Sequence, residues 1–232
     1  MIAALAFLTI VGRGQATGPR AVPWFPVVGA LLGAAVGGVW WGSEQWWPPV
    51  VAGAIAVATD LALTGLLHLD GLADAADGLL PPMDRDRRMA VMSRPDVGAF
   101  AIGVVGTVLP LRVASFGSMA PRVALVAALW CASRTVMAVA LAALPPARPD
   151  GMTATFRGAS PAVPAVVGLV LCAALSVPDP LRTTAALAGV VAGAGLVLLL
   201  SLRRLGGVTG DVLGAAGLVG ETVGLVVAAA RW

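Results

Sequence analysis

Three aspartates lie at a spacing that suits metal chemistry. The segment 68–78 reads His-Leu-Asp-Gly-Leu-Ala-Asp-Ala-Ala-Asp-Gly and places Asp70, Asp74 and Asp77 four and three residues apart. On a helix these positions share one face, with neighbouring Cβ atoms about 5–6 Å apart. Carboxylates this close repel one another unless a cation lies between them, and their hard oxygens suit Mg²⁺ or Mn²⁺. The spacing therefore predicts a catalytic metal site held by these three residues; a solvated acidic helix end is the alternative.

The residues around the aspartates favour a functional segment over a merely stable helix. Gly71 and Gly78 flank the cluster and leave room for a bulky ligand or a close helix. Each glycine costs about 1 kcal/mol relative to alanine in a helix. His68 opens the segment, where it is either a catalytic group that takes a proton from a reacting hydroxyl or a hydrogen-bonded anchor. Both interpretations of His68 stay open from the sequence.

A second segment, 206–215, has the composition of a phosphate cradle. It reads Gly-Gly-Val-Thr-Gly-Asp-Val-Leu-Gly-Ala and opens an apolar run. Free backbone N–H groups of a glycine-rich turn before a helix bind phosphate, so Gly207, Thr209 and Gly210 are predicted to bind substrate. Asp211 is predicted to join the metal ligands of the first segment. An ordinary helix cap is the alternative role for Asp211.

Three arginines are candidates for phosphate contacts. Arg85 and Arg88 follow the first acidic segment, and guanidinium groups bind phosphate in a bidentate manner. A loop enriched in arginine on the cytoplasmic side would explain both without a substrate. Arg134 lies near the middle of an apolar run, where ionisable groups are rare and usually functional. We assign all three to substrate binding and expect Asp60 as a partner of Arg134.

The composition indicates that lipid surrounds the elements that carry these residues. The chain has 232 residues, of which 59% are hydrophobic and 12% charged, and its mean hydropathy is +0.92. Globular domains carry roughly 25% charged residues. The net charge of +3 comes without a basic stripe interleaved with aromatic residues, so we expect no nucleic-acid partner. The prediction is an all-α polytopic bundle in a lipid bilayer.

Seven apolar runs have about the length that a spanning helix requires. We find no internal repeat and no second domain, so residues 1–232 are predicted to form a single integral membrane domain. The predicted spans are 25–42, 49–67, 98–116, 123–144, 162–177, 183–200 and 211–229.

Arginine placement predicts the orientation of these spans. With the N-terminus in the cytoplasm, three arginines fall outside, namely Arg122, Arg182 and Arg231. Ten fall inside: Arg13, Arg20, Arg85, Arg87, Arg88, Arg94, Arg148, Arg157, Arg203 and Arg204. In this topology the segments 68–78 and 206–215 meet on the cytoplasmic side of the membrane, although they are far apart in sequence.

The motifs resemble a known enzyme family. The run 64–78, Thr-Gly-Leu-Leu-His-Leu-Asp-Gly-Leu-Ala-Asp-Ala-Ala-Asp-Gly, is similar to the signature of the adenosylcobinamide-GDP ribazoletransferase (cobalamin synthase) family. Weaker similarities follow in the family's order at Phe7–Thr9, Phe25–Gly29, Ser133-Arg134 and 206–215. Two places depart from the family pattern: Arg94 and Asp96 stand in reversed order, and Leu218 replaces the first of two acids, which leaves Glu221.

The resemblance implies an activity and a location. Members of this family are multi-pass enzymes of the inner membrane that act late in cobalamin biosynthesis and use Mg²⁺ as cofactor. They join adenosylcobinamide-GDP to α-ribazole or α-ribazole 5′-phosphate and release GMP, which makes them phosphotransferases. For this chain the resemblance implies an active site facing the cytoplasm.

Two other functions are compatible with parts of the pattern. CDP-alcohol phosphotransferases also use an aspartate-rich motif on membrane helices, but their pattern has arginine after the alanine where Ala73 is followed by Asp74. A transporter would explain charged residues inside spans, although it usually has related halves, and no internal repeat is evident. The sequence leaves the oligomeric state open, a homo-oligomer included.

Overall fold

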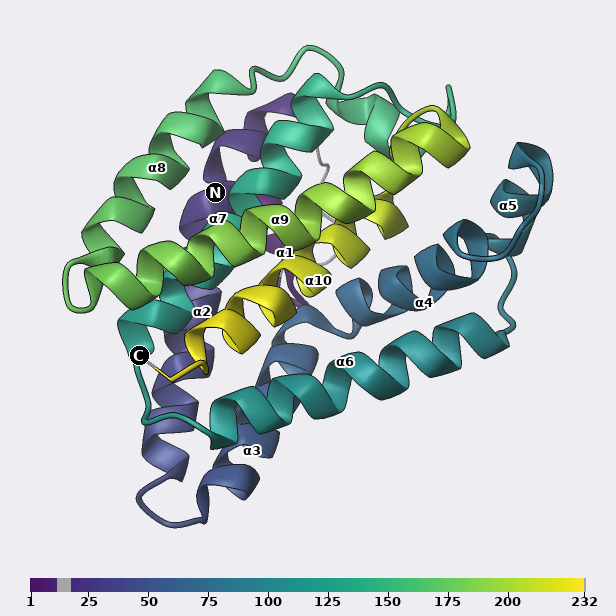
Figure 1. Cartoon of the computed structure of the whole chain (residues 1–232). Coiled ribbons are helices and arrows are strands. Elements are labelled where there is room, and N and C mark those ends of the chain that lie inside the picture. Colours follow the sequence, from purple (N-terminus) through teal and green to yellow (C-terminus); the bar gives the residue numbers. More distant parts are fainter. Residues whose placement is uncertain (12–17, 232) are drawn as a thin grey trace.

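The computed structural model describes residues 1–11 and 18–231, which form a bundle of α-helices (Figure 1). Arg13, which entered the orientation prediction, lies outside the described residues. The only β-type pairing in the described part is an isolated parallel bridge between Pro146 and Val208. The helices are α1 Ile2–Leu8, α2 Phe25–Ser43, α3 Pro49–Thr64, α4 Leu67–Leu79, α5 Arg85–Val91, α6 Ala99–Gly117, α7 Val123–Ala143, α8 Ala162–Ser176, α9 Pro180–Leu205 and α10 Gly210–Ala228.

The helices confirm a polytopic α-helical membrane protein and refine the number of spans. Within the described residues, five helices are long and apolar enough to cross a membrane: α2 with the turn before it, α6, α7, α9 and α10. A helix lies at each of the seven predicted ranges. However, α8 has only 15 residues, and α3 is separated from α4 by a 90° bend. The count is therefore five, or six if the bent pair is one span, instead of seven.

The bend between α3 and α4 redirects the chain just before the acidic segment. Gly65 ends α3 with φ 59°, and Leu66 follows with φ 63°, both in the left-handed region. Glycine adopts this conformation freely, whereas a residue with a side chain loses roughly 1–2 kcal/mol. The predicted span 49–67 therefore ends at Thr64, and His68 belongs to a new helix.

Glycines let the central helices approach closely and so fix the position of their buried side chains. A Cβ atom on Gly29 of α2 would lie 2.5 Å from the carbonyl oxygen of Trp130 of α7. A Cβ atom on Gly220 of α10 would lie 2.9 Å from the carbonyl oxygen of Val190 of α9. Small residues at such crossings are typical of membrane helices. As a result α7 and α10 sit in the interior, with most of their side chains buried.

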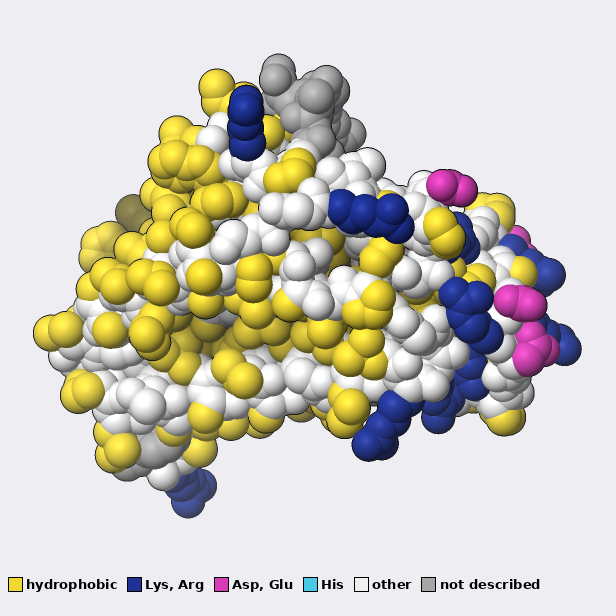
Figure 2. Space-filling view, turned by 90° about the horizontal axis from the view of Figure 1, so that it is seen from above, with side chains coloured by type: hydrophobic (Ala, Val, Ile, Leu, Met, Phe, Trp, Pro, Cys, Tyr) yellow, Lys and Arg dark blue, Asp and Glu magenta, His cyan; other side chains and the backbone are white. Residues whose placement is uncertain are grey.

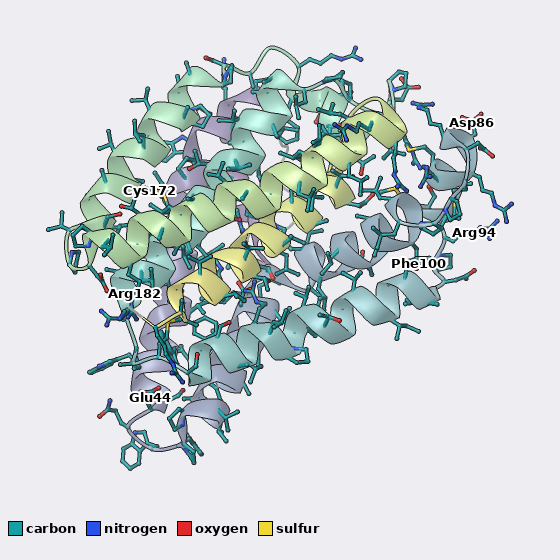
Figure 3. The ribbon with its side chains drawn as sticks, in the orientation of Figure 1. Glu44, Asp86, Arg94, Phe100, Cys172 and Arg182 are labelled. Carbon is teal, nitrogen blue, oxygen red and sulfur yellow. The ribbon has the colours of Figure 1, made fainter. Side chains whose placement is uncertain are left out.

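Charged side chains gather at one end of the bundle. Figure 2 shows most of the visible arginine and acidic side chains at the end that carries α5, while apolar side chains cover much of the remaining surface. Figure 3 places Asp86 and Arg94 at this end, with Glu44 and Arg182 toward the opposite end. This is the arginine asymmetry on which the predicted orientation rests. The C-terminal end of α4 and the α9–α10 junction both lie toward the charged end (Figure 1).

Candidate active site

The two acidic segments predicted from the sequence pack against each other. A Cβ atom on Gly71 of α4 would lie 2.8 Å from the carbonyl oxygen of Asp211, at the start of α10. One on Gly214 would lie 3.3 Å from the Cα atom of His68. Both glycines therefore permit a contact that any side chain would obstruct. The predicted meeting of segments 68–78 and 206–215 is confirmed.

Three of the predicted carboxylates cluster where α4 passes the first turn of α10. Asp70 and Asp211 line a common cavity of about 50 Å³. Asp74 lies one helical turn after Asp70 on α4, and the negative charges of Asp211, Asp70 and Asp77 all act on its carboxylate. Unpaired like charges in a partly buried place are costly and favour a cation among them. These residues are thus the acidic core of the site.

The cluster fits a Mg²⁺ ion that the substrate helps to hold. Within the described residues, no group of three or more His, Cys, Asp or Glu side chains is arranged to hold a metal ion by itself. Mg²⁺ usually retains several waters and binds through one or two carboxylates together with substrate phosphates. Asp70 and Asp211, from different helices but on one cavity, supply a donor set of this kind.

Asp77 has a second role that the sequence did not indicate. Its carboxylate accepts hydrogen bonds from the backbone N–H groups of Gly98, at 2.6 Å, and Ala101, at 3.0 Å. Gly98 directly precedes α6, so Asp77 of α4 caps the N-terminus of α6. A Cβ atom on Gly98 would lie 2.6 Å from the Asp77 carboxylate, which explains the glycine. If Asp77 also binds the metal, as predicted, its carboxylate oxygens must serve both the metal and this cap.

Thr209, and not Asp211, caps α10. The Thr209 hydroxyl accepts a hydrogen bond from the N–H of Val212 at 3.2 Å, so the alternative role of Asp211 as the cap is wrong. Asp211 lies in the first turn, and its carboxylate accepts a 3.4 Å hydrogen bond from the Thr209 hydroxyl. Thr209, Gly210 and Asp211 line a second cavity of about 160 Å³. The substrate contacts predicted for Thr209 and Gly210 would form in this cavity.

Gly207 has a packing role. It is buried, and a Cβ atom on it would lie 2.5 Å from the carbonyl oxygen of Pro145. The next residue, Val208, donates its N–H to Pro145 at 2.9 Å and accepts from the N–H of Ala147 at 2.9 Å. Gly207 is absent from the lining of both cavities, so the predicted phosphate contact of Gly207 finds no support in the described residues.

Arg88 holds the end of α4 instead of facing a cavity. Its buried guanidinium donates to the carbonyl oxygens of Gly78 at 2.7 Å and Leu79 at 3.0 Å. Arg204 of α9 donates to the carbonyl of Leu79 and to that of Leu80, the latter at 3.1 Å. Positive charge at a helix C-terminus satisfies free carbonyls and the helix dipole. The predicted phosphate contact of Arg88 would require it to leave these partners.

Arg85 is also engaged with the backbone. Its guanidinium donates to the carbonyl oxygens of Leu205 and Ala147, at 2.8 and 2.7 Å, and so ties the end of α9 to the segment after α7. The helix that carries it, α5, is capped by Asp84, whose side chain accepts the N–H of Arg87 at 2.9 Å. This hydrogen bond lowers the pKa of the exposed Asp84 carboxyl. Arg85 and Arg88 therefore build the frame of the site.

A buried network of charges joins four helices beside the acidic cluster. Arg112 donates to Asp60 at 2.7 Å and to Glu221 at 3.2 Å, and Arg134 pairs with the other oxygen of Glu221. Trp130 donates to Asp60 at 2.8 Å, and its ring lies 5.0 Å from the Arg112 guanidinium. The expected pair of Arg134 with Asp60 is wrong, because Arg112 occupies that place. Two arginines and two acids balance in charge, as burial in a bilayer demands.

Arg148 is the cationic residue of the site that the sequence reasoning missed. It lines the 160 Å³ cavity with Thr209 and Asp211, and it donates to the carbonyl of Met89 at 2.8 Å. In the sequence it is one arginine among many in a polar connection, and nothing in its spacing separates it from the others. From the sequence, Glu221 was noted only as the acid that remains where Leu218 replaces the other. Its ion pairs were missed because its partners lie in distant apolar runs.

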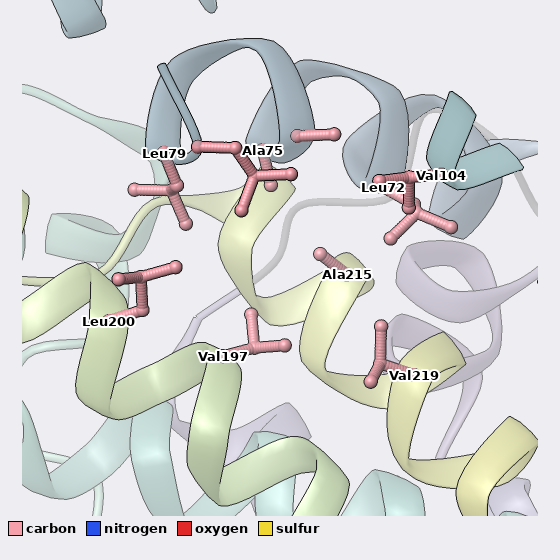
Figure 4. A pocket seen from close by; sticks show the side chains of 10 residues that line it. Leu72, Ala75, Leu79, Val104, Val197, Leu200, Ala215 and Val219 are labelled. Carbon is pink, nitrogen blue, oxygen red and sulfur yellow. The ribbon is translucent and has the colours of Figure 1, made fainter. Parts of the chain in front are cut away.

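The opposite face of α4 is apolar. Leu72, Ala75 and Leu79 line a cavity of about 140 Å³ with side chains of α6, α9 and α10 (Figure 4). Helix α4 therefore has one face of carboxylates and one face of small apolar residues. Its apolar face anchors it in the bundle and fixes the direction of its acidic face.

The fold and the site together define a polytopic helical membrane protein with an acidic cluster at the start of a helix. The family model for cobalamin-5-phosphate synthase matches residues 1–229. The chain belongs to this family.

Curated relatives carry the name adenosylcobinamide-GDP ribazoletransferase. The protein from Chlorobium phaeovibrioides is 32% identical over 231 residues, which cover 95% of this chain and 91% of the relative. The protein from Bradyrhizobium diazoefficiens is 38% identical over 222 residues, covering 91% of this chain and 83% of the relative. The protein from Chlorobium phaeobacteroides is 34% identical, covering 91% and 88%. No solved structure matches the chain.

Proposed function

We propose that this chain is a Mg²⁺-dependent adenosylcobinamide-GDP ribazoletransferase. Family membership makes it a transferase of cobalamin synthesis, and its relatives carry that name. The observation that carries the proposal for the site is the meeting of Asp70 and Asp74 on α4 with Asp211 on α10. The substrates are adenosylcobinamide-GDP and α-ribazole or its 5′-phosphate.

In this reaction a ribose hydroxyl of α-ribazole attacks the phosphorus attached to the cobinamide. A new P–O bond forms, the bond to the GMP phosphate breaks, the hydroxyl proton leaves, and GMP departs with the electron pair. Phosphoryl transfer asks a protein mainly to position its reactants and balance charge. When bound, Mg²⁺ neutralises charge on the diphosphate oxygens.

The residues of this chain divide these tasks. Asp70 and Asp211 would hold the metal together with the substrate phosphates, with Asp74 close to them on α4 and Asp77 at the α6 cap. Arg148 and the first turn of α10 bind phosphate oxygens through the 160 Å³ cavity. A carboxylate of the cluster takes the hydroxyl proton. Arg85, Arg88 and Arg134 support the reaction by holding helices in place, as their hydrogen bonds to carbonyls and acids require.

We further propose that the charged end faces the cytoplasm of a cell with an inner membrane. The arginine excess at this end supports the orientation. Cysteine introduced at exposed Asp86 should react with an impermeant thiol reagent only from the cytoplasmic side, and cysteine at Arg231 only from the other side. Both native cysteines, Cys131 and Cys172, are free and buried, so the background reaction is small. Labelling with reversed sidedness would refute the orientation.

The activity is tested with purified protein in lipid nanodiscs. Adenosylcobinamide-GDP, α-ribazole and Mg²⁺ are mixed, and release of GMP is followed by chromatography. We expect GMP from the wild-type protein, loss on chelation and recovery with added Mg²⁺. Asp74→Asn should abolish turnover although the protein inserts, whereas Asp86→Asn, an exposed acid on α5, should not. Near-normal turnover in Asp74→Asn, or none in the wild type, would contradict the proposal.

The same assay tests the rival functions. CDP-diacylglycerol in place of adenosylcobinamide-GDP should give no transfer, and transfer would favour a CDP-alcohol phosphotransferase. The buried charges that suited a transporter are Arg134 and Asp60, and they are paired within the bundle with Glu221 and Arg112 respectively. They therefore need no transported ion to explain their place.

A further inference from the structure

His68 combines three properties that point to a specific chemical role. It is the single histidine of the chain, and its side chain is only 3% exposed. Its Nδ1 atom lies 3.4 Å from a guanidinium nitrogen of Arg134. Its Nε2 atom is buried and has no hydrogen-bond partner within the described residues. The side chain lines the 50 Å³ cavity together with Asp70 and Asp211.

The partner of Nδ1 fixes the position of the ring proton. A guanidinium has five N–H donors and no acceptor. Arg134 is held in place by Glu221 and by the hydroxyl of Ser133, at 2.8 Å, so it cannot turn away without losing an ion pair. Nδ1 must then accept the hydrogen bond, and the neutral ring carries its proton on Nε2. His68 thus presents an N–H donor without an acceptor.

A buried donor that borders a cavity points to an acceptor that binds there. The other polar side chains on this cavity, Asp70 and Asp211, are carboxylates that attract a cation. Within the described residues, neither of them accepts a hydrogen bond from Nε2 of His68. The cavity of about 50 Å³ has room for an acceptor oxygen beside His68. One oxygen of a phosphate group, held by the cation on one side, would fill this space and accept from Nε2.

We infer that the Nε2–H group of His68 donates a hydrogen bond to a non-bridging phosphate oxygen of the bound nucleoside diphosphate ester. The inference deepens the proposed function and rests on it. His68 is then a donor that stabilises charge on the phosphate during transfer, and not the base that takes the hydroxyl proton. The lone pair of Nδ1 accepts the hydrogen bond from Arg134 and cannot take a proton. The proton of the ribose hydroxyl therefore goes to a carboxylate of the cluster.

The ring proton can be observed directly because the chain has one histidine. Protein labelled with [¹⁵N]histidine in nanodiscs gives the two ring nitrogens of His68 in a long-range ¹H–¹⁵N spectrum. We expect a protonated Nε2 and an unprotonated Nδ1. Arg134→Gln, which replaces a pure donor by an amide with both donor and acceptor, should allow the other tautomer to appear. A wild-type spectrum with the proton on Nδ1, or on both nitrogens, would overturn the inference without any activity measurement.

The donor role is tested by two substitutions of similar size. His68→Gln keeps an N–H group near the place of Nε2, whereas His68→Leu keeps the volume and removes the donor. We expect His68→Leu to lower kcat about 10²–10³-fold, the typical loss of one donor to a developing charge, with a small change in KM. His68→Gln should restore most of this loss. An equal loss in both variants would refute the inference, because a retained N–H donor would then make no difference to turnover.

The two proposals can fail separately. If the wild-type protein releases no GMP, the proposed function fails, while the spectrum still reports whether His68 presents its Nε2 proton. If GMP is released and the ring proton lies on Nδ1, the proposed function stands and the inference on His68 fails. If His68→Leu does not fold, the comparison of His68→Gln with wild type and the tautomer measurement still decide.

Discussion

Replacing Glu221 with glutamine removes one negative charge from the interior of the bundle and leaves its shape almost unchanged. In the wild-type protein Glu221 contacts Arg112 at 3.2 Å with one oxygen and Arg134 with the other, and its side chain is fully buried. After the change Asp60 is the remaining acid for two buried guanidinium groups. Arg134 loses the one acid with which it forms an ion pair among the described residues, while Arg112 retains Asp60 at 2.7 Å.

The expected cost follows from this loss of charge balance. Breaking a buried pair by removing one partner typically costs about 3–5 kcal/mol, because the other charge stays buried without compensation. Glutamine retains one oxygen that can accept from Arg134, so we expect the lower part of this range. The loss should appear as a lower unfolding midpoint of the purified protein in a mild detergent, followed by the fluorescence of its tryptophans.

Two further variants separate charge balance from loss of contact. Asp86→Asn removes an acid whose side chain is 96% exposed and which lies 3.7 Å from Arg85, and it should leave the midpoint unchanged. The double variant Glu221→Gln, Arg134→Gln restores neutrality and should be more stable than Glu221→Gln alone. If Glu221→Gln is as stable as Asp86→Asn, or if the double variant is the least stable, the reasoning about balanced buried charge is refuted.

Three smaller changes test the contacts that shape the site. Gly71→Ala puts a methyl group 2.8 Å from the carbonyl oxygen of Asp211 and should cost about 1–3 kcal/mol and most of the turnover, measured by thermal unfolding and GMP release. Asp77→Ala removes the cap at Gly98 and should cost about 0.5–2 kcal/mol, with faster backbone hydrogen exchange at the start of α6. Thr209→Val removes the cap of α10 and should cost about 1 kcal/mol and raise the KM for the nucleotide substrate. Unchanged stability in any of them would contradict the contact concerned.

The fold was predictable where local composition decides it. A helix lies at each of the seven apolar runs of spanning length, since a bilayer forces backbone groups to pair within each segment, whereas α1, α4 and α5 were not among these runs. The break at Gly65 and Leu66 was missed because the apolar run continues through it, and a left-handed leucine leaves no mark in the sequence. The consequence matters for the site: it is this 90° bend that directs the aspartates along α10.

The acidic part of the site was predictable because it is local. Asp70 and Asp74 follow from spacing on one helix, and Asp211 followed from the topology that brought its segment to the same place. The arginine roles were not predictable from spacing. Whether a guanidinium binds phosphate, as we propose for Arg148, or a helix carbonyl, as Arg88 does, depends on which group of the fold lies within reach of the side chain.

Arg88 allows these two roles to be distinguished by experiment. If it caps α4, Arg88→Ala removes two hydrogen bonds from a charged donor, each worth about 1.5–3 kcal/mol, and lowers stability. The protein that remains folded should keep its KM for adenosylcobinamide-GDP, because the guanidinium never touched the substrate. If it binds phosphate instead, stability should change little and KM should rise.

Arg87 provides the matched control for this test. It is the adjacent residue of α5, carries the same charge and is exposed, and its backbone N–H donates to Asp84. Arg87→Ala should alter neither stability nor KM. A rise in KM for Arg88→Ala at unchanged stability would restore the phosphate contact predicted from the sequence. A loss of stability at constant KM would show that positive charge at the end of α4 serves to hold the last turn, and with it Asp77, against α6.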